Sequence, residues 1–316
     1  MSMTADTPQK QARHADHHSN HIRHTRNDRC AKVIAYLIVG LFGLICLYPL
    51  LLTVTVSLTP EDVINKDGFR LIPRTFTLDT YTYIFAHSGT RILKSYGVTI
   101  IVTAAGTLGS MLVTCMIAYA ISLREMKYRN VIAFICNFTS IFSAGLIPWY
   151  VVCANWYGLR NNILAMILPP LFAVWNMFLM RTYFKAISPS LYDAAKIDGA
   201  GHWTIFFRIA LPLSVTALLT VGLMYALSYW NDWWHALMFI DDRDLYPLQF
   251  YLYSIVSNVN AVSSGRVPSG AAANIRLPAE TVKMAVTIIT IGPILFGYPF
   301  IQRYFVKGIM TGAVKE

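Results

Sequence analysis

The segment Ser190–Leu213 reads SLYDAAKIDGAGHWTIFFRIALPL and lies between two long apolar runs. The chain around it has 316 residues, of which 55% are hydrophobic and only 13% are charged, and its mean hydropathy is +0.48. A soluble domain carries about 25% charged residues. Half that fraction, together with long uncharged runs, places the chain among membrane proteins, so a polar segment kept between two apolar runs needs an explanation.

The polar segment predicts a short helix followed by a turn. Ser188 can cap a helix whose first position is Pro189, and Gly199 and Gly201 are expected to end it. The helix would have about three turns before the chain enters the next apolar run. The alanines and glycines would let another protein approach closely, but alanines alone do not distinguish such a docking helix from a loop helix packed on its own bundle.

Six apolar runs are long enough to cross a bilayer, since a hydrocarbon core of about 30 Å needs roughly 20 helical residues. The runs cover residues 33–58, 95–123, 131–159, 161–180, 209–230 and 284–302. We therefore predict an all-α membrane protein with six transmembrane helices.

The distribution of Lys and Arg predicts the orientation of these helices. With the N-terminus inside, the inner segments hold sixteen of these residues and the outer loops hold nine, with Lys283 at a helix end. Both termini and the segment Ser190–Leu213 are then cytoplasmic, in a multi-pass membrane protein. The net charge of +10 fits this topology, so we predict no nucleic-acid partner.

Three regions follow from this arrangement. Residues 1–30 are expected to form a disordered, basic, His-rich cytoplasmic tail, 31–94 the first transmembrane helix with an extracytoplasmic segment, and 95–316 the transmembrane core with the helix at 188–202. The tail contains HADHHSNHIRH, whose histidines could bind a metal. No fixed element orients them and no Cys or carboxylate set completes a site, so we predict a tail near anionic lipid and no metal site.

The spans contain no ionisable residue near their centres, which argues against several functions. Proton-coupled carriers place such groups in the bundle, and membrane hydrolases need a nucleophile with a base in reach. Asp241, Asp242 and Asp244 form an acidic run in an outer loop, which is typical of a solvated surface. The phosphate-binding pattern GxxxxGK[ST] is missing. We predict no catalytic residue, and any energy for transport must come from a partner.

Neutral polar and aromatic residues gather at the span ends, and two interpretations stay open. Trp and Tyr favour membrane interfaces, so they could form an aromatic belt. Aromatic faces also stack on sugar rings while amides bind hydroxyls, so the same residues could line a sugar path, above all in the group Tyr229–Trp234. The candidates for the path are Asn137, Trp149, Tyr150, Asn176, Trp230, Asn231 and Trp233.

The polar segment resembles the EAA loop of binding-protein-dependent ABC importer permeases. That loop has a Glu-Ala-Ala start, then Asp-Gly-Ala, then Ile-x-Leu-Pro about ten residues on. The matching residues here are Asp193, Ala194, Ala195, Asp198, Gly199, Ala200, Ile209, Leu211 and Pro212. Asp193 stands where the family has Glu, which keeps the charge but shortens the side chain. The resemblance implies that this is the coupling helix, which docks in a groove on the ATPase subunit.

Three other motifs carry the resemblance through most of the chain. GLIPWY at 145–150, NDWWHAL at 231–237 and YPFIQRYFVKGIMTGAVKE at 298–316 resemble segments of the sugar-importer branch, and especially of its polysaccharide and complex-oligosaccharide permeases. The resemblance implies a type I importer (MetI-like) bundle in the bacterial inner membrane that moves a carbohydrate into the cytoplasm. It also implies a homologous second permease subunit, two ATPase subunits holding ATP and Mg, and an extracytoplasmic sugar-binding protein, with no cofactor on this chain.

Other interpretations differ in what they require. A permease of the same fold for another solute, such as an amino acid or phosphate, would have basic residues along its path, and the spans contain none. A proton-coupled carrier or membrane enzyme needs the ionisable groups discussed above, and a purely structural subunit would not couple to transport. Glycines and prolines in the spans can mark moving bends or static kinks: Gly145, Pro148, Pro169, Pro170, Gly292 and Pro293.

Overall fold

The computed structural model describes residues 26–263 and 280–293, which form helices and loops without a β-strand. The elements in chain order are α1 (Arg26–Ser57), α2 (Glu61–Asp67), α3 (Asp79–Ser122), α4 (Arg129–Ile141), α5 (Leu146–Val151), the π-helix η1 (Val152–Trp156), the 3-10 helix η2 (Ile163–Met166), α6 (Val174–Ala186), α7 (Pro189–Ile197), α8 (His202–Ile205), the π-helix η3 (Phe206–Ala210), α9 (Leu211–Leu213), α10 (Val215–Trp230), α11 (Trp234–Phe239), the 3-10 helix η4 (Arg243–Leu245), α12 (Leu248–Ser263) and a helix over 280–293.

The chain divides into two compact units, residues 1–51 and 52–316. The described part of the first unit is the beginning of α1, whose apolar side chains are exposed, as in Tyr36 and Phe42. An apolar helix without a buried face is what a lipid environment favours. The predicted tail lies largely outside the described residues, as do the second half of the run 284–302 and the motif at 298–316.

The long helix α3 organises the second unit, and it begins earlier than predicted. It starts at Asp79 and runs unbroken past residue 95, so the division expected between 94 and 95 falls inside a helix. The first turns contain polar residues and look like a loop in the sequence. They are helical because Ile84 and Ile92 pack in a small core with Leu248, Ala285 and Val286.

Within residues 26–263 and 280–293, two helices, Lys32–Ser57 and Ser88–Ser122, are individually long and apolar enough to cross a membrane. Two further spans would be bent pairs. Arg129–Ile141 meets Leu146–Trp156 at 112°, and His202–Leu213 meets Val215–Trp230 at 84°. The expectation of one continuous helix in each of the runs 131–159 and 209–230 is therefore wrong, while the all-helical membrane fold is confirmed.

The run 161–180 is also not one helix. It consists of η2, an irregular stretch over 167–173 and only then α6. Pro169 and Pro170 lie in the irregular stretch, where each removes a backbone N–H and disfavours helical geometry before it. Gly145 has φ +92 at the bend before α5, so these predicted bend points do lie at breaks.

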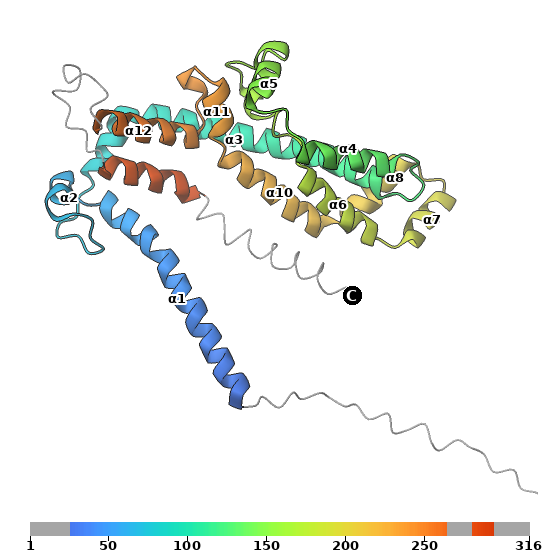
Figure 1. The fold of residues 1–316 in the computed structure, drawn as a ribbon, viewed down its shortest axis with the longest axis horizontal. Coiled ribbons are helices and arrows are strands. Elements are labelled where there is room, and N and C mark those ends of the chain that lie inside the picture. Colours follow the sequence, from blue (N-terminus) through green and yellow to red (C-terminus); the bar gives the residue numbers. More distant parts are fainter. Residues whose placement is uncertain (1–25, 264–279, 294–316) are drawn as a thin grey trace, which may run out of the picture. The chain divides into compact units, whose positions relative to one another are not determined.

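Two buried tyrosines of α10 satisfy the backbone of this irregular stretch. The Tyr225 hydroxyl accepts the Ala173 N–H at 3.0 Å, and the Tyr229 hydroxyl donates to the Ile167 carbonyl at 3.1 Å. The same hydroxyls lie 2.7 and 2.9 Å from hydroxyls of α3, those of Thr114 and Ser110 respectively. Figure 1 shows α6 and α10 alongside α3. The four hydrogen bonds join α10 to α3 and to the irregular stretch 167–173.

Close packing of α3 on Tyr229 generates a stability prediction. A Cβ at Gly106 would lie 2.5 Å from two atoms of the Tyr229 ring, which its two hydrogen bonds hold in place. Gly106→Ala should therefore destabilise the protein by about 1–3 kcal/mol, the usual effect of overpacking. Thermal unfolding in detergent measures this, with Gly97→Ala as the control because a Cβ there meets no atom within 4 Å. Equal melting temperatures for the two variants would contradict the packing.

Candidate functional site

The predicted short helix exists as α7, which begins where Ser188 and Pro189 indicated. It ends at Ile197, so it is shorter than the range 188–202. Ser188 is the N-cap residue and Pro189 takes the first helical position. The Ser188 hydroxyl does not bond to a backbone N–H of the helix; it lies 2.8 Å from the hydroxyl of Ser190. The start of α7 thus depends mainly on the fixed φ of proline.

The end of α7 is a Schellman motif, in which two crossed hydrogen bonds close the last turn. The N–H of Ala200 donates to the Ala195 carbonyl at 2.9 Å, and the N–H of Gly199 donates to the Lys196 carbonyl at 3.0 Å. Gly199 has φ +79, in the left-handed region that side chains with a Cβ disfavour. The Asp-Gly-Ala sequence therefore specifies a sharp, well-defined turn after α7.

One face of α7 packs on the bundle. Ala195 is buried, and the Tyr192 ring lies edge-on to Tyr119 of α3, with ring centroids 6.4 Å apart. The Tyr192 hydroxyl donates to the carbonyl of Phe184 in α6 at 3.5 Å. Burial, with a smaller contribution from Tyr119, raises the pKa of Tyr192 to about 12, so its hydroxyl stays protonated and neutral. This face attaches α7 to both α3 and α6.

The opposite face of α7 is open and mixed in character. Ile197 is 87% exposed although it is apolar, and Leu191 is also exposed. Around them are the remaining predicted coupling residues, of which Ala200 is half-buried and the others are exposed: Asp193, Ala194, Asp198, Gly199 and Ala200. An apolar side chain so exposed on a rigid helix, with small residues beside it, suits close contact with another protein.

A residue that sequence reasoning missed ties α7 to the end of α3. Lys196 of α7 forms an ion pair with Glu125 in the loop after α3. The hydrogen bond from Lys196 is the largest cause that lowers the pKa of Glu125, and the charge of Lys196 adds to it. The pair is therefore intact at neutral pH and is lost as the pH falls through the lowered pKa of Glu125. The partners are 71 residues apart, so local spacing offered no signal.

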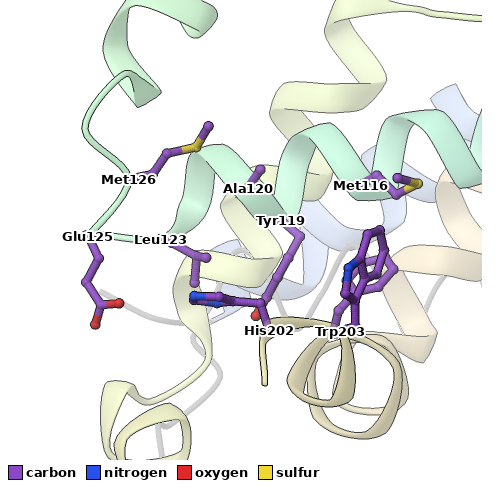
Figure 2. A pocket seen from close by; sticks show the side chains of 9 residues that line it. Met116, Tyr119, Ala120, Leu123, Glu125, Met126, His202 and Trp203 are labelled. Carbon is purple, nitrogen blue, oxygen red and sulfur yellow. The ribbon is translucent and has the colours of Figure 1, made fainter. Parts of the chain in front are cut away.

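A cleft of about 460 Å³ opens beside Glu125, between the end of α3 and the start of α8. Figure 2 shows Met116, Tyr119 and Leu123 on one side and His202 and Trp203 on the other. The cleft is lined mostly by apolar side chains. Trp203, whose side chain is exposed, lines this cleft beside the end of α3 and follows α7 closely in the sequence.

Aromatic side chains gather at the other end of the bundle, around α5 and α11. The Trp149 ring is 5.8 Å from the ring of His235, and both line an open cavity of about 650 Å³ with Trp234. His235 Nδ1 lies 2.7 Å from the Asp232 carboxylate. Asp232 also accepts the N–H groups of Trp234 and His235 at 3.1 and 3.2 Å, which orients the start of α11.

Other predicted path residues lie near this cavity, and each contacts a different partner. Tyr150 stacks on Phe239 of α11 with centroids 5.3 Å apart. Trp233 stacks on Tyr253 of α12 at 4.8 Å, and the Asn231 side-chain carbonyl accepts a hydrogen bond from Gln249 at 3.3 Å. The structure thus brings α5, α11 and α12 together as one aromatic and amide-bearing surface, to which Tyr253 and Gln249 add unpredicted members.

Three candidates are placed apart from that surface. Trp230 lines a shallow groove with Thr103 and Thr107 of α3, and the Nε1–H of Trp230 has no partner among the described residues. Asn137 is exposed on α4, and Asn176 of α6 is only 8% exposed. A path that used all seven candidates would have to run along the bundle rather than through one pocket.

The acidic run serves local structure. Asp241 pairs with Arg160 at 3.1 Å and Asp244 pairs with Lys94 at 3.0 Å. Asp242 accepts the N–H of Asp244 at 2.9 Å and so caps η4. These contacts hold η4 against α3 and the Arg160 loop, and each carboxylate has a structural partner.

Comparison with known proteins decides the family. The family model described as "Binding-protein-dependent transport system inner membrane component" matches residues 127–311, more than half of the chain. The chain belongs to this family. It is therefore a permease of an ABC transporter in the inner membrane, and it is not itself an enzyme.

Individual relatives agree with the family. The polygalacturonan/rhamnogalacturonan transport system permease protein YtcP of Bacillus subtilis is 37% identical, over 91% of this chain and 99% of YtcP. The arabinooligosaccharides transport system permease protein AraQ of Halalkalibacterium halodurans is 29% identical, over 86% of this chain and 92% of AraQ. A solved bacterial ABC transporter involved in the import of the acidic polysaccharide alginate has a chain that is 30% identical, with a TM-score of 0.78 over 89% of this permease and 98% of that chain.

Proposed function

We propose that this permease moves an oligosaccharide or polysaccharide fragment into the cytoplasm, driven by ATPase subunits that dock on α7. The open face of α7 carries the coupling part of this proposal. It presents Ile197 and Leu191 beside a glycine-stabilised turn, while its other face is fixed to α3 and α6. In this proposal the α7 end of the bundle is cytoplasmic, as are both termini.

The proposed partners supply what this chain lacks. Two ATPase subunits bind ATP and Mg, a homologous second permease completes the passage, and an extracytoplasmic binding protein delivers the sugar. Closure of the ATPase pair moves α7, and the contacts of Tyr192 and Lys196 pass that displacement to the ends of α3 and α6. Transport is then a two-state change biased by contacts at both ends of the bundle.

The substrate class is inferred from the opposite end. Trp149, Trp233 and Trp234 supply aromatic faces, while Asn231 and Gln249 supply amides, a combination that suits sugar rings and their hydroxyls. The carbohydrate named for YtcP, AraQ and the alginate transporter supports the same class. Asn231 and Trp233 are the residues that we expect to contact the sugar most directly.

Docking is tested by adding a bulky charge to the turn after α7. Gly199→Arg should reduce co-purification of the ATPase at least about tenfold. It forces a residue with a side chain into left-handed geometry, and its side chain occupies the space that a closely packed ATPase would need. Gly68→Arg is the matched control. Gly68 also has positive φ and open space around it, but it follows α2, away from the coupling segment. Equal ATPase recovery with the two variants would overturn the docking role.

The sugar path is tested by transport measurements in vesicles. Asn231→Ala should lower the transport rate about fivefold through the lost hydrogen bond, and Trp233→Ala roughly tenfold through the lost aromatic face. The affinity of the binding protein for sugar should not change, because it is a separate chain. Trp175→Ala, at an exposed tryptophan outside the candidate set, is the control. Unchanged transport in both test variants would contradict the assignment of Asn231 and Trp233 to the sugar path.

A further inference from the structure

A second cavity at the α7 end, of about 530 Å³, gathers basic side chains from three helices and the loop after α3. It lies where the end of α3, the start of α4, the end of α6 and α7 meet. Its charged lining consists of Arg124, Arg129, Arg181, Lys185 and Lys196, with the acidic residues Glu125 and Asp193. Five cations and two carboxylates leave a net positive charge in one cavity.

Most of these cations have no charged partner in the described parts of the chain. Lys196 pairs with Glu125, but no carboxylate there lies within 4.0 Å of the other four cationic side chains. Arg129 donates to the Arg124 carbonyl at 3.2 Å, and Arg181 donates to the Ile121 carbonyl at 3.3 Å. Neutral carbonyls orient these guanidinium groups but do not offset their mutual repulsion, which an anion in the cavity would do.

The start of α4 adds to the attraction for an anion. Its 13 residues begin at Arg129, no side chain caps its first turn, and that turn contains no acidic residue. The uncapped N–H groups and the helix dipole favour negative charge at this point. Asn130, in the first turn, lines the cavity and offers an amide donor as well.

The surface next to the cavity indicates where the anion comes from. Beyond Asn130, α4 exposes a series of large apolar side chains, Val131, Phe134, Ile135 and Phe138. A basic cavity directly beside an exposed apolar helix face matches a phospholipid, whose phosphate is charged and whose chains are apolar. Excess Lys and Arg on the cytoplasmic side are expected from topology alone, but topology does not require them to converge in one cavity.

We propose that this cavity binds the phosphate group of an anionic phospholipid from the cytoplasmic leaflet. Arg124, Arg129, Arg181 and Lys185 hold the phosphate, and the acyl chains follow the exposed face of α4. Because Tyr192, Asp193 and Lys196 line the same cavity, the bound phosphate lies against α7. This inference rests on the proposed orientation of the permease, and its test reads lipid binding rather than ATPase docking.

The test uses the full-length permease in detergent and native mass spectrometry. The probes are phosphatidylglycerol, phosphatidylcholine with the same acyl chains, and inorganic phosphate. The cavity variant is Arg124→Gln with Lys185→Gln, two exposed positions whose change should not disturb packing. The matched control is Lys127→Gln with Arg208→Gln, which removes two exposed cations outside the cavity lining.

We expect phosphatidylglycerol to bind more tightly than phosphatidylcholine, and the cavity variant to weaken its binding roughly thirty-fold while the control changes little. Equal binding of the two lipids, or equal losses in the two variants, would overturn the site. If inorganic phosphate bound with the same dependence on the variants and displaced the lipid, the assignment to lipid would be wrong. Loss of ATPase recovery with unchanged lipid binding would identify a partner's carboxylate as the occupant instead.

Discussion

The need to satisfy backbone polar groups inside an apolar bundle governs this structure. Lipid offers no hydrogen bonds, so every break in a membrane helix must find partners within the protein. Here the stretch 167–173 departs from helical geometry, and the hydroxyls of Tyr225 and Tyr229 supply the missing bonds to Ala173 and Ile167. The same hydroxyls reach Thr114 and Ser110 of α3, so the irregular part of the chain is fastened to its longest helix.

The helix α7 packs against this hydrogen-bonded bundle. The rings of Tyr119, Phe184 and Phe206 pack together where α3, α6 and η3 meet, with centroids 5.0 to 6.4 Å apart. Tyr192 of α7 extends that aromatic cluster, and the pair Lys196–Glu125 adds a charged contact at its edge. A helix packed on the bundle by one face and exposed on the other can be displaced by a partner and transmit that displacement to the bundle.

The helix α7 was predictable because its signals are local. Ser188 and Pro189 mark the start of a helix and Gly199 marks its end, whatever surrounds them. The breaks within the apolar runs were less accessible. Pro169 and Pro170 indicated a bend, but the extent of the irregular stretch depends on tyrosines more than fifty residues later in the sequence.

The aromatic surface of α5, α11 and α12 shows the same contrast. The sequence singled out Trp149, Asn231 and Trp233 by residue type, and the structure brings their elements together at one end of the bundle. The sequence could not indicate that Asn176 is buried or that Gln249 and Tyr253 join this surface, because those facts depend on how α6 and α12 pack. Likewise, the basic cavity beside α7 draws on four separate elements, and no single stretch of sequence contains it.

Photo-cross-linking tests the central claim, that the open face of α7 contacts an ATPase subunit, most directly. A benzophenone side chain would replace Ile197, or Ile147 of α5 as a control, since both are strongly exposed apolar residues. Irradiation of the assembled transporter in membranes should join the ATPase to position 197 and not to position 147. Absence of that product at 197, or equal products at both positions, would contradict the assignment of α7 as the coupling helix.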